Sequence, residues 1–332
     1  MVSTLQSWPE PVVRVQSVSD SGTHAIPECY VKAIYDRPSS LDNISSIEAN
    51  DIPIIDLANL YANDPNLRKT TMDLISDACR EWGMFQVINH GVSHHLMEAT
   101  KTVWREFFHL PLDMKQTRVG VEKGAKLDWS DYFFLHFLPA SMRDERKWPT
   151  HPSSCRLMKI FSVNLGLDED YLEKAFGGEE IGASLRVNFY PKCPQPDLTL
   201  GISPHSDSGG ITILLPDDHV SGLQVRKDDA WVTVKPIPNA FIINIADQLQ
   251  VLSNAKYKSI EHRVIVNSNE ERVSLAFFYN PRGDIPIKPA EELITDTESA
   301  LYQPMTFNEY RTFIRLNGLH GKSQVESLKS PR

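Results

Sequence analysis

The sequence predicts a mainly β protein with flanking helices, in which an N-terminal helical part is attached to a double-sheet β core. Two observations predict this class. Before residue 111, apolar side chains recur largely at the spacing of three to four residues that is typical of helices. From Ala183 onward, short runs of β-branched and aromatic residues are separated by turn residues, as in an antiparallel sandwich or barrel. At 332 residues the chain is long enough to bury a sizeable core.

The first half of the chain predicts an arm, a short strand, a helix and a second strand. Residues 1–50 are rich in proline, serine and aspartate, which predicts an arm that lies over the body of the protein. Residues 52–57 predict the short strand. A helix is expected from Arg68 and should stop at Gly83, and residues 84–89 alternate as a strand. The residues at helical spacing are Met72, Ile75, Cys79 and Trp82.

Two further helices are predicted from their end signals. One begins after Ser93, a residue that can cap a helix, and ends at Pro111. Its expected buried stripe is Leu96, Thr100, Val103 and Phe107. Near the C-terminus, Thr306 and Glu309 form a capping box that opens a last helix, which should end near Gly318. The polar tail after it is expected to be loose.

The β core is predicted between these helical parts. Its clearest strands are residues 211–215, 223–226, 231–234, 241–245, 260–266 and 273–279. Lys227, Asp228 and Asp229 suit the turn of a hairpin between two of them.

Composition excludes several classes of function. Hydrophobic residues make up 41% and charged residues 23% of the chain, as in soluble globular proteins. The net charge of −9 argues against nucleic acid or an anionic membrane as a main partner. The four cysteines have no Cys-x-x-Cys spacing, so neither a zinc knuckle nor a disulfide framework is expected. No secretory signal and no membrane-spanning apolar stretch is seen, and a cytoplasmic location is expected.

The strongest functional signal is a pair of histidines with a carboxylate. His205 and Asp207 are two residues apart, so on a strand their side chains would share a face. His262 belongs to a later predicted strand, where alternation should turn it inward and Arg263 outward. Two histidines and one carboxylate form the facial site of non-haem iron(II) oxygenases, which leaves coordination positions open.

Other interpretations of these residues remain. Either histidine alone would more often be a loop or core residue than a ligand. Two histidines and a carboxylate also suit a hydrolytic zinc site, although the chain contains neither His-Glu-x-x-His nor Gly-x-Ser-x-Gly.

A second polar cluster suits a carboxylate ligand. In the predicted strand that follows His262, Arg272, Ser274, Ala276 and Phe278 share one face. In the predicted strand 185–191, Arg186, Asn188 and Tyr190 share one face. A guanidinium forks onto a carboxylate and a hydroxyl can add a further hydrogen bond. A zinc hydrolase would give this cluster no role. An outward arginine in a surface ion pair is the alternative.

These residues resemble the plant 2-oxoglutarate- and iron(II)-dependent dioxygenases over nearly the whole chain. The matching pieces are residues 54–56, 82–91, 188–193, His205/Asp207/His262 and 272–274. The resemblance implies a double-stranded β-helix, or jelly roll, and the activity of an oxidoreductase that hydroxylates its substrate. It implies that His205, Asp207 and His262 bind iron(II) as the catalytic centre. It implies that Arg272, Ser274, Tyr190 and Asn188 bind 2-oxoglutarate, with ascorbate as reductant.

The resemblance also implies four divisions of the chain. They are an arm (1–50), an N-terminal α/β region (51–180), the dioxygenase core (181–300) and a C-terminal helix and tail (301–332).

Within that family the chain is most similar to the jasmonate-induced oxygenases. The pieces that carry this likeness are residues 8–16, 121–125, 214–218 and 321–327. The resemblance implies hydroxylation of jasmonic acid to 12-hydroxyjasmonic acid, which is hormone catabolism and bears on plant defence. It implies that Arg186, Arg311 and Arg315 hold the substrate carboxylate and that Phe278 and Phe307 line its apolar part. Arg311 and Arg315 are four residues apart and would share a helix face, which could equally be a solvated basic face.

The chain departs from the resemblance at two places that look short, between Gln116 and Val119 and between Ser154 and Met158. The first would shorten a loop near the pocket mouth, and the second would remove the front of a helix behind the β core. Three alternatives to a jasmonate hydroxylase stay open: a flavonoid or other specialised-metabolite dioxygenase of the same family, a zinc hydrolase, and a non-catalytic jelly-roll binding protein.

Overall fold

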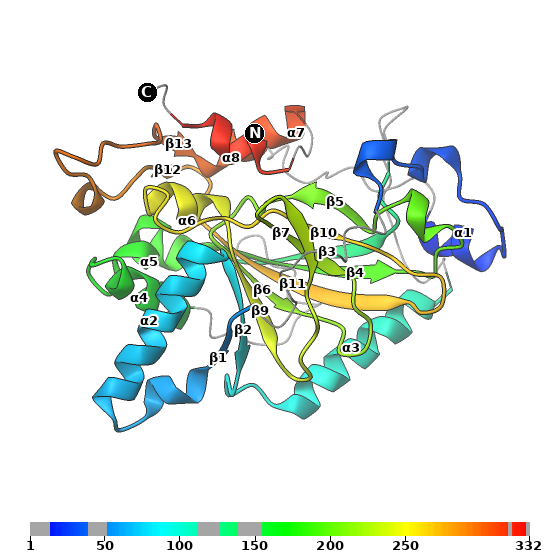
Figure 1. Ribbon diagram of the computed structural model, residues 1–332, viewed down its shortest axis with the longest axis horizontal. Coiled ribbons are helices and arrows are strands. Elements are labelled where there is room, and N and C mark those ends of the chain that lie inside the picture. The colour runs from blue at the N-terminus through cyan, green and yellow to red at the C-terminus, as the bar shows by residue number, and fades with distance from the viewer. Residues whose placement is uncertain (1–13, 39–51, 112–126, 139–154, 318–320, 330–332) are drawn as a thin grey trace.

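Two facing β-sheets form the centre of the protein (Figure 1). The computed structural model describes residues 14–38, 52–111, 127–138, 155–317 and 321–329. In spatial order, the seven-stranded sheet contains β1 (Ile54–Asp56), β2 (Met84–Ile88), β9 (Phe241–Ile245), β6 (Ile211–Leu215), β11 (Arg272–Asn280), β4 (Gly182–Tyr190) and β3 (Asp131–Leu138). The four-stranded sheet contains β5 (Ile202–His205), β10 (His262–Val264), β7 (Leu223–Lys227) and β8 (Ala230–Thr233). This mainly β, jelly-roll architecture confirms the predicted fold class.

Strand alternation gives the seven-stranded sheet two chemically different faces. On β4, Leu185, Val187 and Phe189 pack into an apolar cluster under a helix, whereas the residues between them line a pocket between the sheets. The neighbouring strand β11 repeats the pattern in register, with Arg272 opposite Tyr190 and Ser274 opposite Asn188. The polar side chains of both strands therefore enter one interior space.

Helices cover the outer face of the seven-stranded sheet. One group consists of α2 (Pro65–Glu81), α4 (Cys155–Asn164) and α5 (Tyr171–Ala175), and their buried side chains join a cluster with β2, β6 and β9. The other cover is α3 (His94–His109), which packs on β4 and β11. Burial of these apolar faces stabilises the fold at roughly 25 cal/mol per Å2 of apolar surface removed from water.

The buried face of α3 differs from the predicted stripe. Leu96 and Val103 are each 59% exposed, whereas Met97, Lys101 and Phe108 are buried. The reason is Lys101, whose ammonium pairs with Asp218 and lies 2.6 Å from Glu98. A lysine whose charge is paired can be buried. The spacing of apolar residues does not predict such a position. Ser93 stands at the N-cap position, but its side chain makes no capping hydrogen bond.

Both terminal segments pack against the body. In the arm, α1 (Val15–Asp20) begins with two backbone amides, those of Val15 and Gln16, that donate to the Asp131 carboxylate at 3.0 and 2.9 Å. At the other end, the described part of the tail, residues 321–329, is not loose: it contains α8 (Ser323–Ser327), and Val325 is fully buried. The sequence prediction for the tail was therefore wrong, because its few apolar residues find a tertiary contact.

The predicted turn and cap are confirmed. Asp228 and Asp229 both have positive φ between β7 and β8, as a two-residue hairpin turn requires. Thr306 Oγ1 accepts a hydrogen bond from the Glu309 amide at 3.2 Å, and Glu309 Oε2 accepts one from the Thr306 amide at 2.8 Å. This capping box opens α7 (Phe307–Asn317).

The remaining elements are short. They comprise α6 (Asp247–Leu252), the strand pair β12 (Pro286–Ile287) and β13 (Met305–Thr306), and the 3-10 turns η2 (Glu28–Tyr30), η3 (Ile34–Asp36), η6 (Leu57–Tyr61), η10 (Gly178–Glu180), η11 (Pro196–Leu198) and η12 (Glu291–Leu293). Among the described residues, no helix has the length and apolar character that crossing a membrane demands.

The junction between α2 and β2 gives a test of the fold. Gly83 has a φ of +72°, and a Cβ there would overlap the carbonyl oxygen of Lys258. We expect Gly83→Ala to lower the free energy of unfolding by about 1–2 kcal/mol for the left-handed backbone and by an additional ~1–3 kcal/mol for the overlap. Gly91 is the matched control, because its φ is +81° but nothing lies within 4 Å of its Cβ position. Denaturant unfolding of both variants measures the difference, and equal losses would contradict the close packing at Gly83.

Candidate active site

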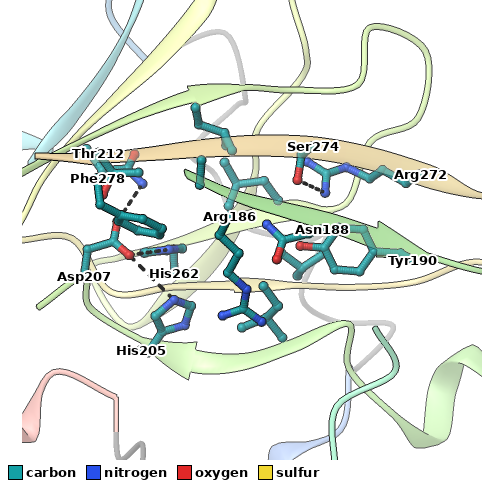
Figure 2. A pocket seen from close by; sticks show the side chains of 16 residues that line it. Arg186, Asn188, Tyr190, His205, Asp207, Thr212, His262, Arg272, Ser274 and Phe278 are labelled. Carbon is teal, nitrogen blue, oxygen red and sulfur yellow. Dashed lines mark hydrogen bonds and ion pairs between the residues drawn. The ribbon is translucent and has the colours of Figure 1, made fainter. Parts of the chain in front are cut away.

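Two histidines and an aspartate converge at the end of the pocket between the sheets (Figure 2). His205 is the last residue of β5 and His262 the first of β10, and the two are direct partners in the antiparallel pair. Their rings are 4.3 Å apart, and each Nε2 lies 3.8 Å from Asp207 Oδ1. One ligand atom from each of the three residues lies within 4.8 Å of the others. The predicted triad is thus brought together, as a metal site requires.

The route by which Asp207 reaches the triad differs from the expectation. β5 ends at His205, so Asp207 lies in the loop that follows and not on the strand. Backbone hydrogen bonds from the start of α6 hold this loop. The amides of Ala246, Asp247 and Gln248 donate to the carbonyls of Gly210, Asp207 and Gly209 at 3.0, 2.9 and 2.8 Å. Tertiary hydrogen bonding, rather than the pleat of a strand, therefore turns the Asp207 carboxylate toward the histidines.

Hydrogen bonds orient both imidazoles. His205 Nδ1 lies 2.9 Å from the carbonyl oxygen of Ser203, and His262 Nδ1 lies 3.1 Å from that of Ile260. Because a carbonyl can only accept, Nδ1 carries the proton in each ring and Nε2 keeps its lone pair. Ser203 is in turn held by Asp128, whose carboxylate accepts from its hydroxyl at 2.6 Å and also pairs with Lys32 of the arm. Such supporting contacts fix ligand orientation in metal sites.

The protonation states of His205 and Asp207 suit a divalent cation. Burial, assisted by the neighbouring His262, lowers the pKa of His205 to about 4, so this imidazole is neutral at pH 7. Burial by itself raises the pKa of Asp207, but the two imidazoles outweigh it and hold that pKa below its usual value. Metal ions bind neutral imidazole and ionised carboxylate, so neither His205 nor Asp207 has to lose a proton before a cation enters.

Deeper in the pocket, β4 and β11 present a cationic cradle. Arg272 is 4% exposed, and its Nη1 donates to Ser274 Oγ at 3.3 Å. Its guanidinium lies 5.1 Å from the ring centre of Tyr190. Among the described residues, Arg272 Nε and Asn188 Oδ1 have no hydrogen-bond partner. A buried guanidinium with donors to spare is costly unless an anion joins it, which indicates a site for a carboxylate.

An ion-pair network stands behind this cradle. The backbone amide of Val273 donates to Asp217 Oδ2 at 3.2 Å, and Asp217 pairs with Arg105 of α3. Burial alone would raise the pKa of Asp217, but the surrounding amides and the cations of Arg105 and Arg272 lower it. Asp217 is therefore an ionised support that fixes the backbone next to Arg272.

The remaining predicted residues divide between the pocket and its surroundings. Arg186 and Phe278 line the pocket, and the Arg186 guanidinium lies 4.2 Å from the ring centre of Tyr132. Arg186 Nε has no hydrogen-bond partner among the described residues.

The two arginines on α7 lie outside this pocket lining. Burial and the nearby charge of Arg315 lower the pKa of Arg311. Burial lowers the pKa of His136 on β3, and the nearby charge of Arg311 lowers it further, so Arg311 lies near the edge of the sheet. Its guanidinium is 5.7 Å from the ring centre of Phe307, which is buried under the helix. Arg315 is exposed. The structure thus brings Arg311 near the sheet that carries Arg186, but not Arg315.

Arg263 shows why alternation alone does not predict exposure. It points away from the triad, as expected, yet it is 3% exposed. Its Nε donates to Gln224 Oε1 at 2.8 Å, and its guanidinium lies 4.3 Å from the ring centre of Trp231. The outward arginine is thus buried among partners rather than solvated.

Sequence reasoning missed several residues of the site. Asn244 donates to Asp207 Oδ2 at 3.4 Å, and Thr212 lines the same wall of the pocket. Asn244 is a single polar residue within the apolar strand β9, and that break in an apolar run was the available signal. Tyr132, under Arg186, had no comparable signal because it lies in a strand that was not predicted.

Comparisons with known proteins agree with this geometry. The model of the 2OG-Fe(II) oxygenase superfamily matches residues 181–281, and that of the non-haem dioxygenase in morphine synthesis N-terminal family matches residues 52–151. Jasmonate-induced oxygenase 2 of Arabidopsis thaliana is 54% identical, with 99% of this chain and 96% of the relative covered. Flavanone 3-dioxygenase 2 of Oryza sativa subsp. japonica is 38% identical over 89% of this chain and 92% of the relative.

Solved structures show the same relationship. A crystal structure of JOX2 in complex with 2OG, Fe and JA has a TM-score of 0.86 and 54% identity, and covers 98% of this chain and 100% of that one. A dioxygenase for auxin oxidation from rice has a TM-score of 0.67 at 23% identity, covering 84% of this chain and 100% of that one, and shares the fold.

The alignments also bear on the two segments that look short. The alignment with jasmonate-induced oxygenase 2 spans 358 positions, and this chain has 332 residues. At least 358 − 332 = 26 positions of that relative therefore have no counterpart here. The position of the first short segment, residues 116–119, lies outside the described residues, as does Ser154 at the start of the second.

Three observations lead to one conclusion: the similarity over the full length, the complete two-histidine-one-carboxylate triad and the buried cationic cradle. The chain belongs to the 2-oxoglutarate- and iron(II)-dependent oxygenases and is a dioxygenase of that family.

Proposed function

We propose that this dioxygenase hydroxylates jasmonic acid to 12-hydroxyjasmonic acid and so inactivates the hormone. The observation that carries the proposal is Arg186, a guanidinium on the pocket wall with no hydrogen-bond partner for its Nε among the described residues. It stands between aromatic rings and the metal triad, as a small acid with an apolar body would need. The crystal structure of the relative JOX2 in complex with JA supports the same substrate.

His205, Asp207 and His262 would hold iron(II). Their ligand atoms are close enough to meet at one ion, and the protonation states of His205 and Asp207 match its needs. Iron(II) and 2-oxoglutarate, when bound, supply the oxidation: one atom of dioxygen goes into succinate as 2-oxoglutarate loses carbon dioxide, and the other into the new hydroxyl group. Ascorbate would serve as the reductant that maintains iron(II), and we expect the enzyme to work in the cytoplasm.

The cradle on β4 and β11 would bind the far carboxylate of 2-oxoglutarate. Arg272 and Ser274 would donate to it, with the Tyr190 hydroxyl and Asn188 as further partners. Burial of Tyr190 raises the pKa of its hydroxyl, so the group keeps its proton and can donate. The opposite end of the cosubstrate would then point along the pocket toward the triad (Figure 2).

The substrate would lie between Arg186 and α7. Arg186 and Arg311 would clamp its carboxylate, with Arg315 closing from the exposed side. Phe278 and Phe307 would contact its apolar part. Fixing the acid at one end holds the pentenyl tail at the triad, and holding reactants in place is a large part of catalysis.

A different substrate of the same family is the second candidate. Arg315 is exposed and Arg311 does not line the described pocket, which would suit a neutral substrate such as a flavonoid. Similarity to flavanone 3-dioxygenase 2 allows this alternative. Mass spectrometry of products formed from jasmonic acid or a flavanone, with iron(II), 2-oxoglutarate and ascorbate present, decides between them.

The metal assignment predicts a loss of turnover when a ligand is removed. We expect Asp207→Ala to reduce iron(II)-dependent succinate formation at least about 100-fold, because loss of even supporting residues costs about 10–100-fold. His219→Ala is the control, since this histidine is exposed in the loop after β6. Dialysis against a chelator should also abolish turnover, and iron(II) should restore it. Restoration by zinc with hydrolysis of an ester would instead indicate a hydrolase, and no decarboxylation with iron bound would indicate a binding protein.

The cradle predicts a change in cosubstrate affinity. We expect Arg272→Ala to lower kcat/KM for 2-oxoglutarate by about 10–100-fold, corresponding to a charge-assisted hydrogen bond of ~1.5–3 kcal/mol. Arg226→Ala is the control, because this arginine is on β7 and pairs with the exposed Asp229. Steady-state kinetics with varied 2-oxoglutarate measures the effect. Unchanged kinetics for Arg272→Ala would contradict the assignment.

The substrate clamp predicts a separate effect. We expect Arg311→Ala to lower kcat/KM for jasmonic acid by about 10–100-fold through loss of a charge-assisted contact, while KM for 2-oxoglutarate stays the same. Arg282→Ala is the control, because Arg282 is exposed and pairs with Asp284. Normal turnover of jasmonic acid by Arg311→Ala would show that this arginine is not part of the clamp.

A further inference from the structure

One buried hydrogen bond connects the loop that carries the metal triad to the helix that carries Arg311. The hydroxyl of Tyr310 on α7 donates to Asp247 Oδ2 at 2.7 Å. Tyr310 is 1% exposed and Asp247 is completely buried. A buried carboxylate is costly in free energy unless it is hydrogen-bonded, so this contact is strongly favoured over separation of the two groups.

The same Asp247 contacts the metal loop through its backbone. Its amide donates to the carbonyl oxygen of Asp207 at 2.9 Å. The path from the triad to α7 is therefore two hydrogen bonds long: from Asp207 to the Asp247 amide, and from the Asp247 carboxylate to Tyr310. The next residue in the chain is Arg311.

The position of Arg311 depends on how α7 is rotated about its axis. Tyr310 is hydrogen-bonded to Asp247 of α6, and consecutive residues on a helix point about 100° apart, so Arg311 points to a different side of α7 than Tyr310. Fixing Tyr310 thus fixes the direction of Arg311. The start of α7 is held as well, because the Asn308 amide donates to the Gly283 carbonyl at 2.9 Å. Beyond the helix, the Gly321 amide donates to the carbonyl of Pro204 at 3.2 Å, next to His205.

We propose that Tyr310 and Asp247 are positioning residues that set the distance and angle between the metal site and the cation of Arg311, and hence which carbon of the substrate is oxidised. The proposal rests on the proposed function, because it needs Arg311 to hold the substrate carboxylate. Neither residue touches the pocket, so neither is a catalytic residue.

The experiment removes only the hydroxyl, with Tyr310→Phe. Tyr257→Phe is the matched control: Tyr257 is also fully buried, its hydroxyl lies 3.3 Å from Ser76, and its ring packs on Phe161 on the outer side of the sheet. For wild type and each variant, succinate formed per hydroxylated jasmonate is measured together with the position of the new hydroxyl group and the KM for 2-oxoglutarate.

We expect Tyr310→Phe to keep the wild-type KM for 2-oxoglutarate. The amount of hydroxylated jasmonate formed per succinate should fall by roughly 10–100-fold, since misplacing a substrate by about 1 Å can lower the reaction rate ~100-fold. Succinate should then exceed hydroxylated product, and hydroxylation should spread to neighbouring carbons. Tyr257→Phe should lose thermal stability without changing the ratio or the position. Asp247→Ala should reproduce the Tyr310→Phe pattern, and the double variant should be no worse than the worse single variant, because both remove one interaction.

A wild-type ratio and a single hydroxylation site in Tyr310→Phe would overturn the proposal, as would equal changes in Tyr257→Phe. Failure of the proposed function appears separately in the wild-type arm: if the unaltered enzyme decarboxylates 2-oxoglutarate but does not oxidise jasmonic acid, the substrate is wrong, and the positioning proposal is overturned with it.

Discussion

The alternation of side chains on the paired strands β4 and β11 is the constraint on which the rest of the structure depends. Odd and even positions of a strand must face opposite sides of the sheet. Here one side is apolar and covered by α3, and the other bears Arg186, Asn188, Arg272 and Ser274. A shift of register by one residue would bury the charges under α3 and expose the apolar set to the pocket. The apolar packing of α3 therefore holds the cationic cradle in place.

The metal site depends on the opposite sheet and on loops. β5 and β10 place the two histidines opposite each other, because their terminal residues are register partners. The carboxylate comes from a loop held by three consecutive backbone amides, so the third ligand depends on contacts that β pairing does not supply. Distant parts of the chain support the ligands: Lys32 of the arm through Asp128 and Ser203, and α7 through Asp247. Packing of the arm and of the C-terminal segment is thus linked to the chemistry of the pocket.

Several features of the structure could not be predicted from the sequence, for a common physical reason. The buried face of α3 includes Lys101, and the outward Arg263 of β10 is buried under Trp231. In both cases a charged side chain found partners from distant segments, so its burial could not be read from local apolar periodicity. The C-terminal tail is polar in composition, yet Gly321 pairs with His205 and Val325 is buried. The Asp247–Tyr310 contact spans 63 residues and carries no local signature at all.

The sequence by itself determined the chemistry and most of the fold. The alternation around Arg272 and the capping box at Thr306 are local patterns, and both are confirmed. His205, Asp207 and His262 come together as predicted, although Asp207 does so from a loop and not from a strand. Only the tertiary structure decided which arginines approach the pocket, because Arg186 lies on β4 and both Arg311 and Arg315 lie on α7, and the relative placement of these two elements depends on long-range packing. Arg186 lines the pocket, Arg311 lies near the sheet edge and Arg315 stays exposed. Ligand type follows from residue identity and spacing, whereas the geometry of substrate recognition follows from contacts between segments far apart in the chain.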